Sequence, residues 1–166
     1  DNRYVNTADL RVSGVDLTAN WGFDLGDGRI ALGASGSWIL AYEQRVTPTA
    51  AAVDRAGVAN FPVEFRGRLT ADWTRGPLTV GAALNHVSAY EDALGTRIAA
   101  QPSVDLQLRW APAVRGPLQG LGARLTVRNA FDRAPPFYDN VAGVAYDPAN
   151  ADPVGRFVSL QLTRDW

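Results

Sequence analysis

Residues 14–25 read GVDLTANWGFDL, and this stretch decides the fold class because apolar and polar residues alternate along it. One face would carry Val15, Leu17, Ala19, Trp21, Phe23 and Leu25. The other would carry Asp16, Thr18, Asn20, Gly22 and Asp24. A repeat of two residues belongs to a β-strand, whereas a helix repeats about every 3.6 residues. The stretch therefore predicts a strand with one apolar and one polar face.

Short signals on both sides of this stretch predict where the strand bends and ends. Upstream, Leu10 and Val12 fall in the opposite phase, so we expect a β-bulge at Ser13–Gly14 to restore the alternation. Downstream, GDG at Gly26–Gly28 is typical of a tight turn. The chain should therefore return directly into a second, antiparallel strand.

The alternation recurs in six further segments, which gives seven predicted strands. These segments cover residues 30–42, 61–73, 78–86, 103–110, 121–128 and 158–166. The connections are in turn short, long, short, long, moderate and long, and the long ones cover 43–60, 91–102 and 132–155. Short turns at one end and long loops at the other are typical of transmembrane β-barrels.

Composition excludes several classes of protein. The 166 residues include 16 basic residues, all arginine, and 17 acidic ones, so the net charge of −1 gives no reason to expect nucleic-acid binding. Cysteine is absent, which excludes disulfides and thiolate chemistry. The longest run without a formal charge, residues 76–90, is shorter than the roughly 20 apolar residues that a membrane-spanning helix needs.

Aromatic residues gather at the ends of the predicted strands, as they do in the two girdles that flank the apolar band of a membrane barrel. One girdle would hold Trp21, Phe23, Trp73, Trp110 and Trp166, and the other Trp38 and Tyr42. A soluble sandwich or lipocalin-like barrel predicts the alternation equally well, but it does not predict this sorting. We therefore expect an all-β fold, an antiparallel transmembrane β-barrel segment.

The opposite face mixes small residues with charged ones, a mixture that suits a wet lumen. The charged candidates for this lumen are Arg66, Arg68, Asp72, Asp105, Arg109, Arg124 and Arg128. An odd number of antiparallel strands cannot close without a parallel seam, and the chain begins on Asp1 rather than methionine. We therefore expect residues 1–166 to be part of a larger barrel.

The closing segments resemble the C-terminal signature of TonB-dependent outer-membrane receptors. VRNAFDRAPPFYDN at 127–140 matches the family's Asn-Leu-Phe-Asp followed by Pro-Pro, with Ala130 in place of the leucine. YDPANADPVGRFVSLQLTRDW at 146–166 matches its Tyr-Asp-Pro segment, its Gly-Arg and a last strand that ends in an aromatic residue. GVDL at 14–17 and RGRLTADWTRGPLTVGAALNHV at 66–87 also resemble late barrel strands of the family.

The resemblance implies that these are the last seven strands of a barrel of about 22 strands. It also implies an N-terminal plug domain and a TonB box, neither of which is present in 1–166. Such receptors lie in the outer membrane of Gram-negative bacteria. They import ferric siderophores, cobalamin or oligosaccharides with energy from TonB, ExbB and ExbD.

The resemblance further implies roles for individual residues. An assembly signal read by the outer-membrane assembly machinery would consist of Val158, Leu160, Leu162 and Trp166. The charged residues of the lumen would pair with the plug or line the ligand path, or they would simply solvate a wet interior. No cofactor is implied.

Catalysis and metal binding have weaker support in the sequence. His86 and Ser88 share a predicted face but lack an orienting third residue, so we expect no enzyme. Asp132, Asp139, Asp147 and Asp152 lack the spacing of a calcium loop, and Asx-turns explain them better. Two other functions stay open: a self-contained small outer-membrane barrel with a structural or adhesion role, and a soluble β-sheet binding domain.

Overall fold

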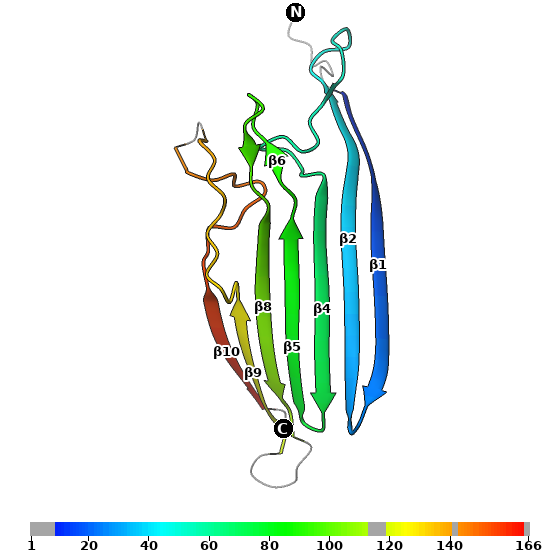
Figure 1. The fold of residues 1–166 in the computed structure, drawn as a ribbon, viewed down its shortest axis with the longest axis vertical. Coiled ribbons are helices and arrows are strands. Elements are labelled where there is room, and N and C mark those ends of the chain that lie inside the picture. Colours follow the sequence, from blue (N-terminus) through cyan, green and yellow to red (C-terminus); the bar gives the residue numbers. More distant parts are fainter. Residues whose placement is uncertain (1–8, 113–118, 141–142, 165–166) are drawn as a thin grey trace, which may run out of the picture.

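The computed structural model describes residues 9–112, 119–140 and 143–164, and within these ranges it consists of strands and loops without a helix. Figure 1 shows long strands side by side in one sheet. The strands are β1 (Asp9–Leu25), β2 (Gly28–Arg45), β3 (Val53–Asp54), β4 (Phe65–Arg75), β5 (Leu78–Val87), β6 (Tyr90–Glu91), β7 (Arg97–Ile98), β8 (Gln101–Trp110), β9 (Leu121–Arg128) and β10 (Phe157–Arg164). The predicted all-β class is confirmed.

Seven long strands pair in the order β1-β2-β4-β5-β8-β9-β10, and every neighbouring pair is antiparallel. The short β3 adds to β2, and β6 and β7 form a separate hairpin. β1 pairs only with β2, and β10 pairs only with β9, so the described strands form an open sheet with two free edges. Within the described ranges no helix is long and apolar enough to cross a membrane.

The two tight turns lie where the sequence predicted them. Gly26 and Asp27 join β1 to β2, and Gly76 and Pro77 join β4 to β5. Gly26 and Gly76 have φ values of 59° and 53°, a left-handed conformation that glycine adopts without strain. Figure 1 shows these turns at one end of the sheet and the long connections at the other, which we call the turn end and the loop end.

The predicted bulge is present in the first hairpin. The register between β1 and β2 shifts at Ser13/Gly14, where Ser13 pairs with Ala41 and Gly14 with Ile39. A Cβ atom on Gly14 would lie 2.6 Å from the carbonyl oxygen of Trp38, so only glycine fits this close approach.

The third predicted strand is shorter than the sequence suggested. β4 begins at Phe65, and Phe61 and Val63 lie in the preceding loop rather than in a strand. Asn60 has a φ of 69° and Pro62 lacks an amide hydrogen, and both features interrupt extended pairing. Val63, only 2% exposed, packs instead with Ala59, Tyr90 and Ile98 in a small core at the loop end.

The strand pairing places nearly all large apolar side chains of the sheet on one face. Trp21 pairs with Leu32, Leu32 with Ala71, and the same phase continues through β5, β8 and β9 to Leu160 of β10. This apolar face is open to its surroundings: Trp21 is 69%, Leu17 59% and Leu160 66% exposed.

Little apolar surface is buried anywhere else. Among the described residues the buried apolar set consists of Ala59, Val63, Ala83, Tyr90 and Ile98. The accessible surface is 11663 Å², whereas a compact monomer of this mass has about 8,000 Å². The described part of the chain therefore provides no cover over the apolar face of the sheet.

Candidate functional site

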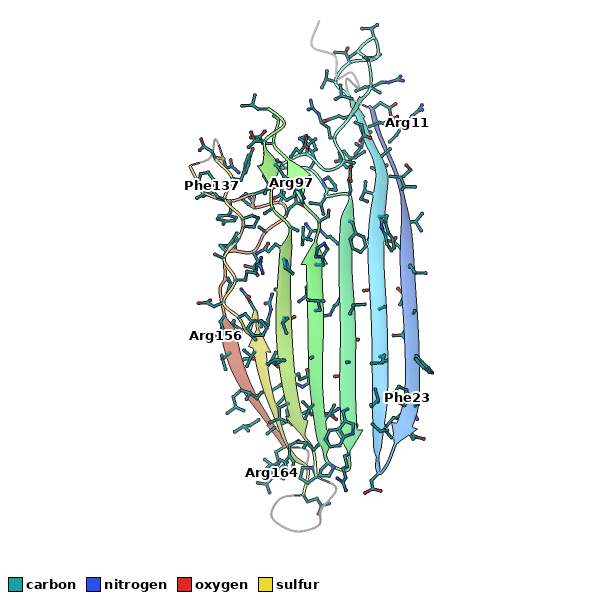
Figure 2. The ribbon with its side chains drawn as sticks, in the orientation of Figure 1. Arg11, Phe23, Arg97, Phe137, Arg156 and Arg164 are labelled. Atoms are coloured by element: carbon teal, nitrogen blue, oxygen red, sulfur yellow. The ribbon has the colours of Figure 1, made fainter. Side chains whose placement is uncertain are left out.

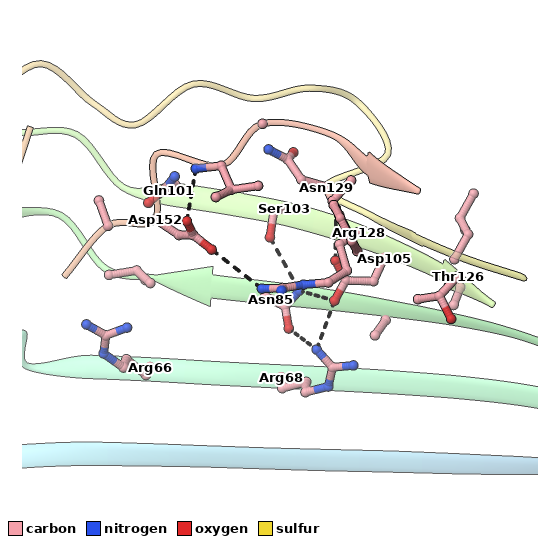
Figure 3. A pocket seen from close by; sticks show the side chains of 18 of the residues that line it. Arg66, Arg68, Asn85, Gln101, Ser103, Asp105, Thr126, Arg128, Asn129 and Asp152 are labelled. Carbon is pink, nitrogen blue, oxygen red and sulfur yellow. Dashed lines mark hydrogen bonds and ion pairs between the residues drawn. The ribbon is translucent and has the colours of Figure 1, made fainter. Parts of the chain in front are cut away.

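The polar face of the sheet carries the seven charged residues predicted to face a lumen, and it divides them between two cavities. Arg66, Arg68, Asp72, Asp105 and Arg128 line a cavity of about 760 Å³ toward the loop end. Arg109 and Arg124, which pair across β8 and β9, line a second cavity of about 420 Å³ with Gln161 and Thr163. The larger cavity, shown in Figure 3, is the candidate site.

The floor of the larger cavity holds a connected group of polar side chains around Asp105 on β8. Asp105 accepts hydrogen bonds from Arg68 Nη1 at 3.2 Å, from Asn85 Nδ2 at 2.9 Å and from the backbone N–H of Asn129 at 3.0 Å. Arg68 also donates to Asn85 Oδ1, so three neighbouring strands are linked (Figure 3). Ser103 completes the group by accepting from Asn85 at 3.3 Å.

The wall of the cavity at the loop end comes from a distant part of the chain, residues 147–155. Arg66 Nη2 donates to Asn150 Oδ1 at 2.7 Å, and Arg128 forms an ion pair with Asp152 at 3.5 Å. The last long loop thus folds back over the polar face and contacts both β4 and β9. The charges lining the cavity are largely engaged by neighbours of this chain.

Asp147 anchors this wall. Its carboxylate is fully buried, and Oδ2 accepts from the backbone N–H of Asn60 at 3.1 Å and from Asn150 Nδ2 at 2.8 Å. Oδ1 accepts from the N–H of Ala149 at 3.0 Å. Asn150 Nδ2 also donates to the carbonyl of Phe61 at 2.7 Å.

Tyr90 lies beside this carboxylate. Burial raises the pKa of its phenol above the ordinary value, and the nearby charge of Asp147 raises it further. The hydroxyl is buried, and it faces Asp147 without a hydrogen bond of acceptable geometry to any described residue. The phenol is therefore held neutral next to a buried acidic group.

The Asn-Ala-Phe-Asp motif at 129–132 acts as a structural clasp between β9 and β10. Asn129 donates to the carbonyl of Arg133 and accepts from its N–H, both at 2.9 Å, which closes a small ring. Asp132 Oδ1 accepts from the N–H of Arg156 at 2.7 Å, one residue before β10 begins. Asn129 and Asp132 both have a positive φ, which Asn and Asp tolerate better than most residues.

The predicted girdle aromatics lie near the two ends of the sheet. Toward the turn end, where Figure 2 labels Phe23, Trp21 and Phe23 pack with ring centroids 5.3 Å apart. Trp73 and Trp110 lie on the same face of the sheet, on β4 and β8. Toward the loop end, Trp38 packs on Phe65 at 4.7 Å and Tyr42 on Phe61 at 5.9 Å. Trp166 lies outside the described residues.

The predicted assembly signal lies on β10. Val158, Leu160 and Leu162 pair with Val127, Leu125 and Ala123 and share the apolar face, while Trp166 again lies outside the described part of the chain. These placements fix the faces of the side chains, and the signalling role stays a prediction.

The weaker candidates for chemistry do not come together. His86 lies on the apolar face, 6.0 Å from the ring of Phe65, whereas the Ser88 hydroxyl accepts the N–H of Phe65 at 3.3 Å. Asp147 and Asp152 each accept the backbone N–H two residues further on, as the Asx-turn interpretation predicts. Asp132 instead accepts the N–H of Arg156, a long-range contact that the interpretation does not predict. The described residues contain no group of three or more potential metal ligands.

Sequence reasoning missed the amide side chains that organise the site. Asn85 and Asn150 bridge strands and loops, but a lone asparagine has no pattern that marks it in advance. For Asp147 the sequence predicts an Asx-turn in preference to calcium binding. The succession of Asp, Pro and Asn in 147–153 did indicate turns, yet not that one carboxylate would be buried.

Fold and site together define an antiparallel sheet with one exposed apolar face and one polar face that carries two cavities. No protein-family model, curated protein or solved structure matches the chain.

Proposed function

We propose that the chain forms the C-terminal barrel strands of a TonB-dependent receptor in the outer membrane of a Gram-negative bacterium. The receptor would take up a scarce ligand such as a ferric siderophore, cobalamin or an oligosaccharide. The observation that carries the proposal is the apolar face, which continues across seven strands and is not covered by any of the described residues. A lipid bilayer is the partner that such a face requires, because hydrocarbon covers apolar side chains without a second protein layer.

Strand length supports this partner. A membrane-spanning strand needs about 9–11 tilted residues. β4, β5 and β8 have 11, 10 and 10 residues. Aromatic residues lie near both ends of these strands or of their neighbours, and in the proposal these ends are where the bilayer meets water.

The polar face supports a receptor rather than a passive anchor. It carries a cavity of about 760 Å³ that is lined by three arginines, three aspartates and several amides. In the proposal this face is directed into the barrel, toward the plug and the ligand path, and the loop end is extracellular. The ending of the chain, with its Asn-Ala-Phe-Asp clasp, supports the receptor family in particular. TonB, ExbB and ExbD would act through the plug, which lies outside this segment.

Cell fractionation with an antibody against this segment tests the membrane part of the proposal. We expect a band several times larger than 17.8 kDa in the outer membrane, soluble only in detergent. A band near 17.8 kDa in that fraction would favour a self-contained small barrel. A band soluble without detergent would contradict a membrane location altogether.

Uptake tests the receptor part. Cells with and without the gene are supplied with labelled ferric siderophores, cyanocobalamin or maltooligosaccharides, each with and without a functional TonB. One labelled compound should accumulate only when both the gene and TonB are intact. If every compound accumulates equally in all four strains at low concentration, the proposed transport role is wrong for these ligands.

A further inference from the structure

Residues 147–155 cross the loop end of the larger cavity and are held at three points. At the first, Asp147 accepts the N–H of Asn60, a residue of the loop that precedes β4. At the second, Asn150 binds both the carbonyl of Phe61 and the guanidinium of Arg66. At the third, Asp152 pairs with Arg128 at the end of β9.

The three attachments differ in strength. The ion pair of Arg128 with Asp152 is mostly exposed, so water screens it and it holds the segment weakly. Asp147 is fully buried, and its carboxylate satisfies three N–H donors that belong to two different loops. Removing the carboxylate would take the acceptor from all three donors at once, including the buried amide of Asn150, whereas loss of the exposed ion pair costs little.

We propose that residues 147–155 form a fixed strap that closes the loop end of the cavity, and that Asp147 is the positioning residue that holds the strap down. A molecule that approaches the cavity floor from the loop end, and is too large to pass beside the strap, reaches the floor only when the strap opens locally. The frequency of that opening is set by the hydrogen bonds of Asp147 rather than by the exposed ion pair. The inference rests on the proposed larger barrel, which would close the other sides of the cavity, and it holds whatever the protein transports.

Cysteine labelling tests the strap in the natural full-length protein. This chain has no cysteine, so a Ser103→Cys variant introduces one thiol on the cavity floor, and peptide mass mapping reports its modification. A small maleimide and a polymer-linked maleimide are compared. In the parent, the large reagent should react far more slowly than the small one.

Asp147→Ala in the Ser103→Cys background should then speed labelling by the large reagent at least about tenfold, which corresponds to about 1.4 kcal/mol of lost bias toward the closed strap. Asp147→Asn keeps one acceptor and should give an intermediate rate. Asp152→Ala, which removes the exposed ion pair and one hydrogen bond from the N–H of Val154 within the strap, should change the rate less than twofold. A matched cysteine at Ser35, on the same face of β2 but outside the cavity, should label equally fast in every background.

Equal rates for the large reagent in the parent and Asp147→Ala, with unchanged near-ultraviolet circular dichroism, would overturn the proposal. A larger effect of Asp152→Ala than of Asp147→Ala would also overturn it. Where Asp147→Ala fails to fold, Asn150→Ala replaces it as the second anchor. If neither variant folds, the segment is an integral part of the sheet rather than a strap, and the proposal is wrong.

Discussion

Leu106 and Gln107 are neighbours on β8 whose side chains lie on opposite faces of the sheet. Leu106 pairs with Ala82 and Val127 on the apolar face, and Gln107 with Gly81 and Thr126 on the polar face. A charge introduced at either position lies on the same strand and at nearly the same distance from the strand ends. The two positions therefore compare the surroundings of the two faces directly.

We expect Leu106→Arg to lower the free energy of unfolding in lipid by about 2–4 kcal/mol, because an arginine near the middle of a lipid-facing strand loses its hydration. Gln107→Arg should change it by less than about 1 kcal/mol, since a wet lumen accepts the charge. Arg109→Leu, also on the polar face, should be comparatively harmless. Denaturant titration in lipid vesicles measures all three, and the opposite ranking would contradict a lipid-facing apolar face.

Tyr90 gives a pH-dependent prediction. Its folded pKa is raised by burial, so the neutral phenol stabilises the fold fully below the unfolded pKa of about 10. That contribution is lost as the pH rises from there through the folded pKa. Tyrosinate absorbance should show one late-titrating tyrosine, and Tyr90→Phe should remove it. Persistence of the late step in Tyr90→Phe would assign it to another tyrosine.

The face of the sheet on which each strand residue lies could be predicted from the sequence, because the alternation of apolar and polar residues is a local property. All seven charged lumen candidates lie on the polar face for this reason. The burial of Asp147 could not be predicted, because it depends on Asn60, which is 87 residues away along the chain. A contact of that kind has no local pattern.

At the scale of elements, the first hairpin, β1 and β2, contains the two longest strands. Among the described strands of the main sheet, it is also the only pair whose register shifts. Gly14→Ala should lower the free energy of unfolding by about 1–3 kcal/mol, because the new methyl group meets the Trp38 carbonyl oxygen, a backbone atom that cannot move aside. Ser13→Ala, next to it, should stay within about 0.5 kcal/mol. Thermal unfolding of both variants in detergent measures the difference, and equal midpoints would contradict the tight bulge.

The first and last residues of the strands were harder to predict from the sequence than the presence of the strands. The first tight turn could be predicted from GDG at 26–28 and the second from the short connection between residues 73 and 78, and in each turn a glycine adopts the positive φ that it tolerates without strain. The start of β4 was placed too early, because Phe61 and Val63 continue the alternation although Pro62 interrupts the pairing. The two-residue strands β3, β6 and β7 were missed, since pairs this short are too brief to show a period.

At the scale of the whole molecule, the proposed orientation of the strands across the bilayer predicts the depth of each tryptophan below the membrane surface. In variants that keep only Trp73, lipids brominated near the headgroup should quench fluorescence more strongly than lipids brominated near the chain ends. With Trp73 replaced by Phe, a tryptophan introduced as Leu106→Trp should show the reverse order, because it lies near the middle of its strand. Equal quenching of both by all lipids would contradict the transmembrane orientation.

The contact between the strap and the loop before β4 also indicates when in folding the strap forms. The two tight hairpins join residues that are close in the chain, so their closure costs little entropy and we expect it to occur early.

The bond between Asn60 and Asp147 spans 87 residues, so we expect it to close late, after the strands between them have paired. Formation of this hydrogen bond would therefore indicate that the intervening strands have already paired. Late protection of the Asn60 amide from hydrogen exchange would mark the final step of folding.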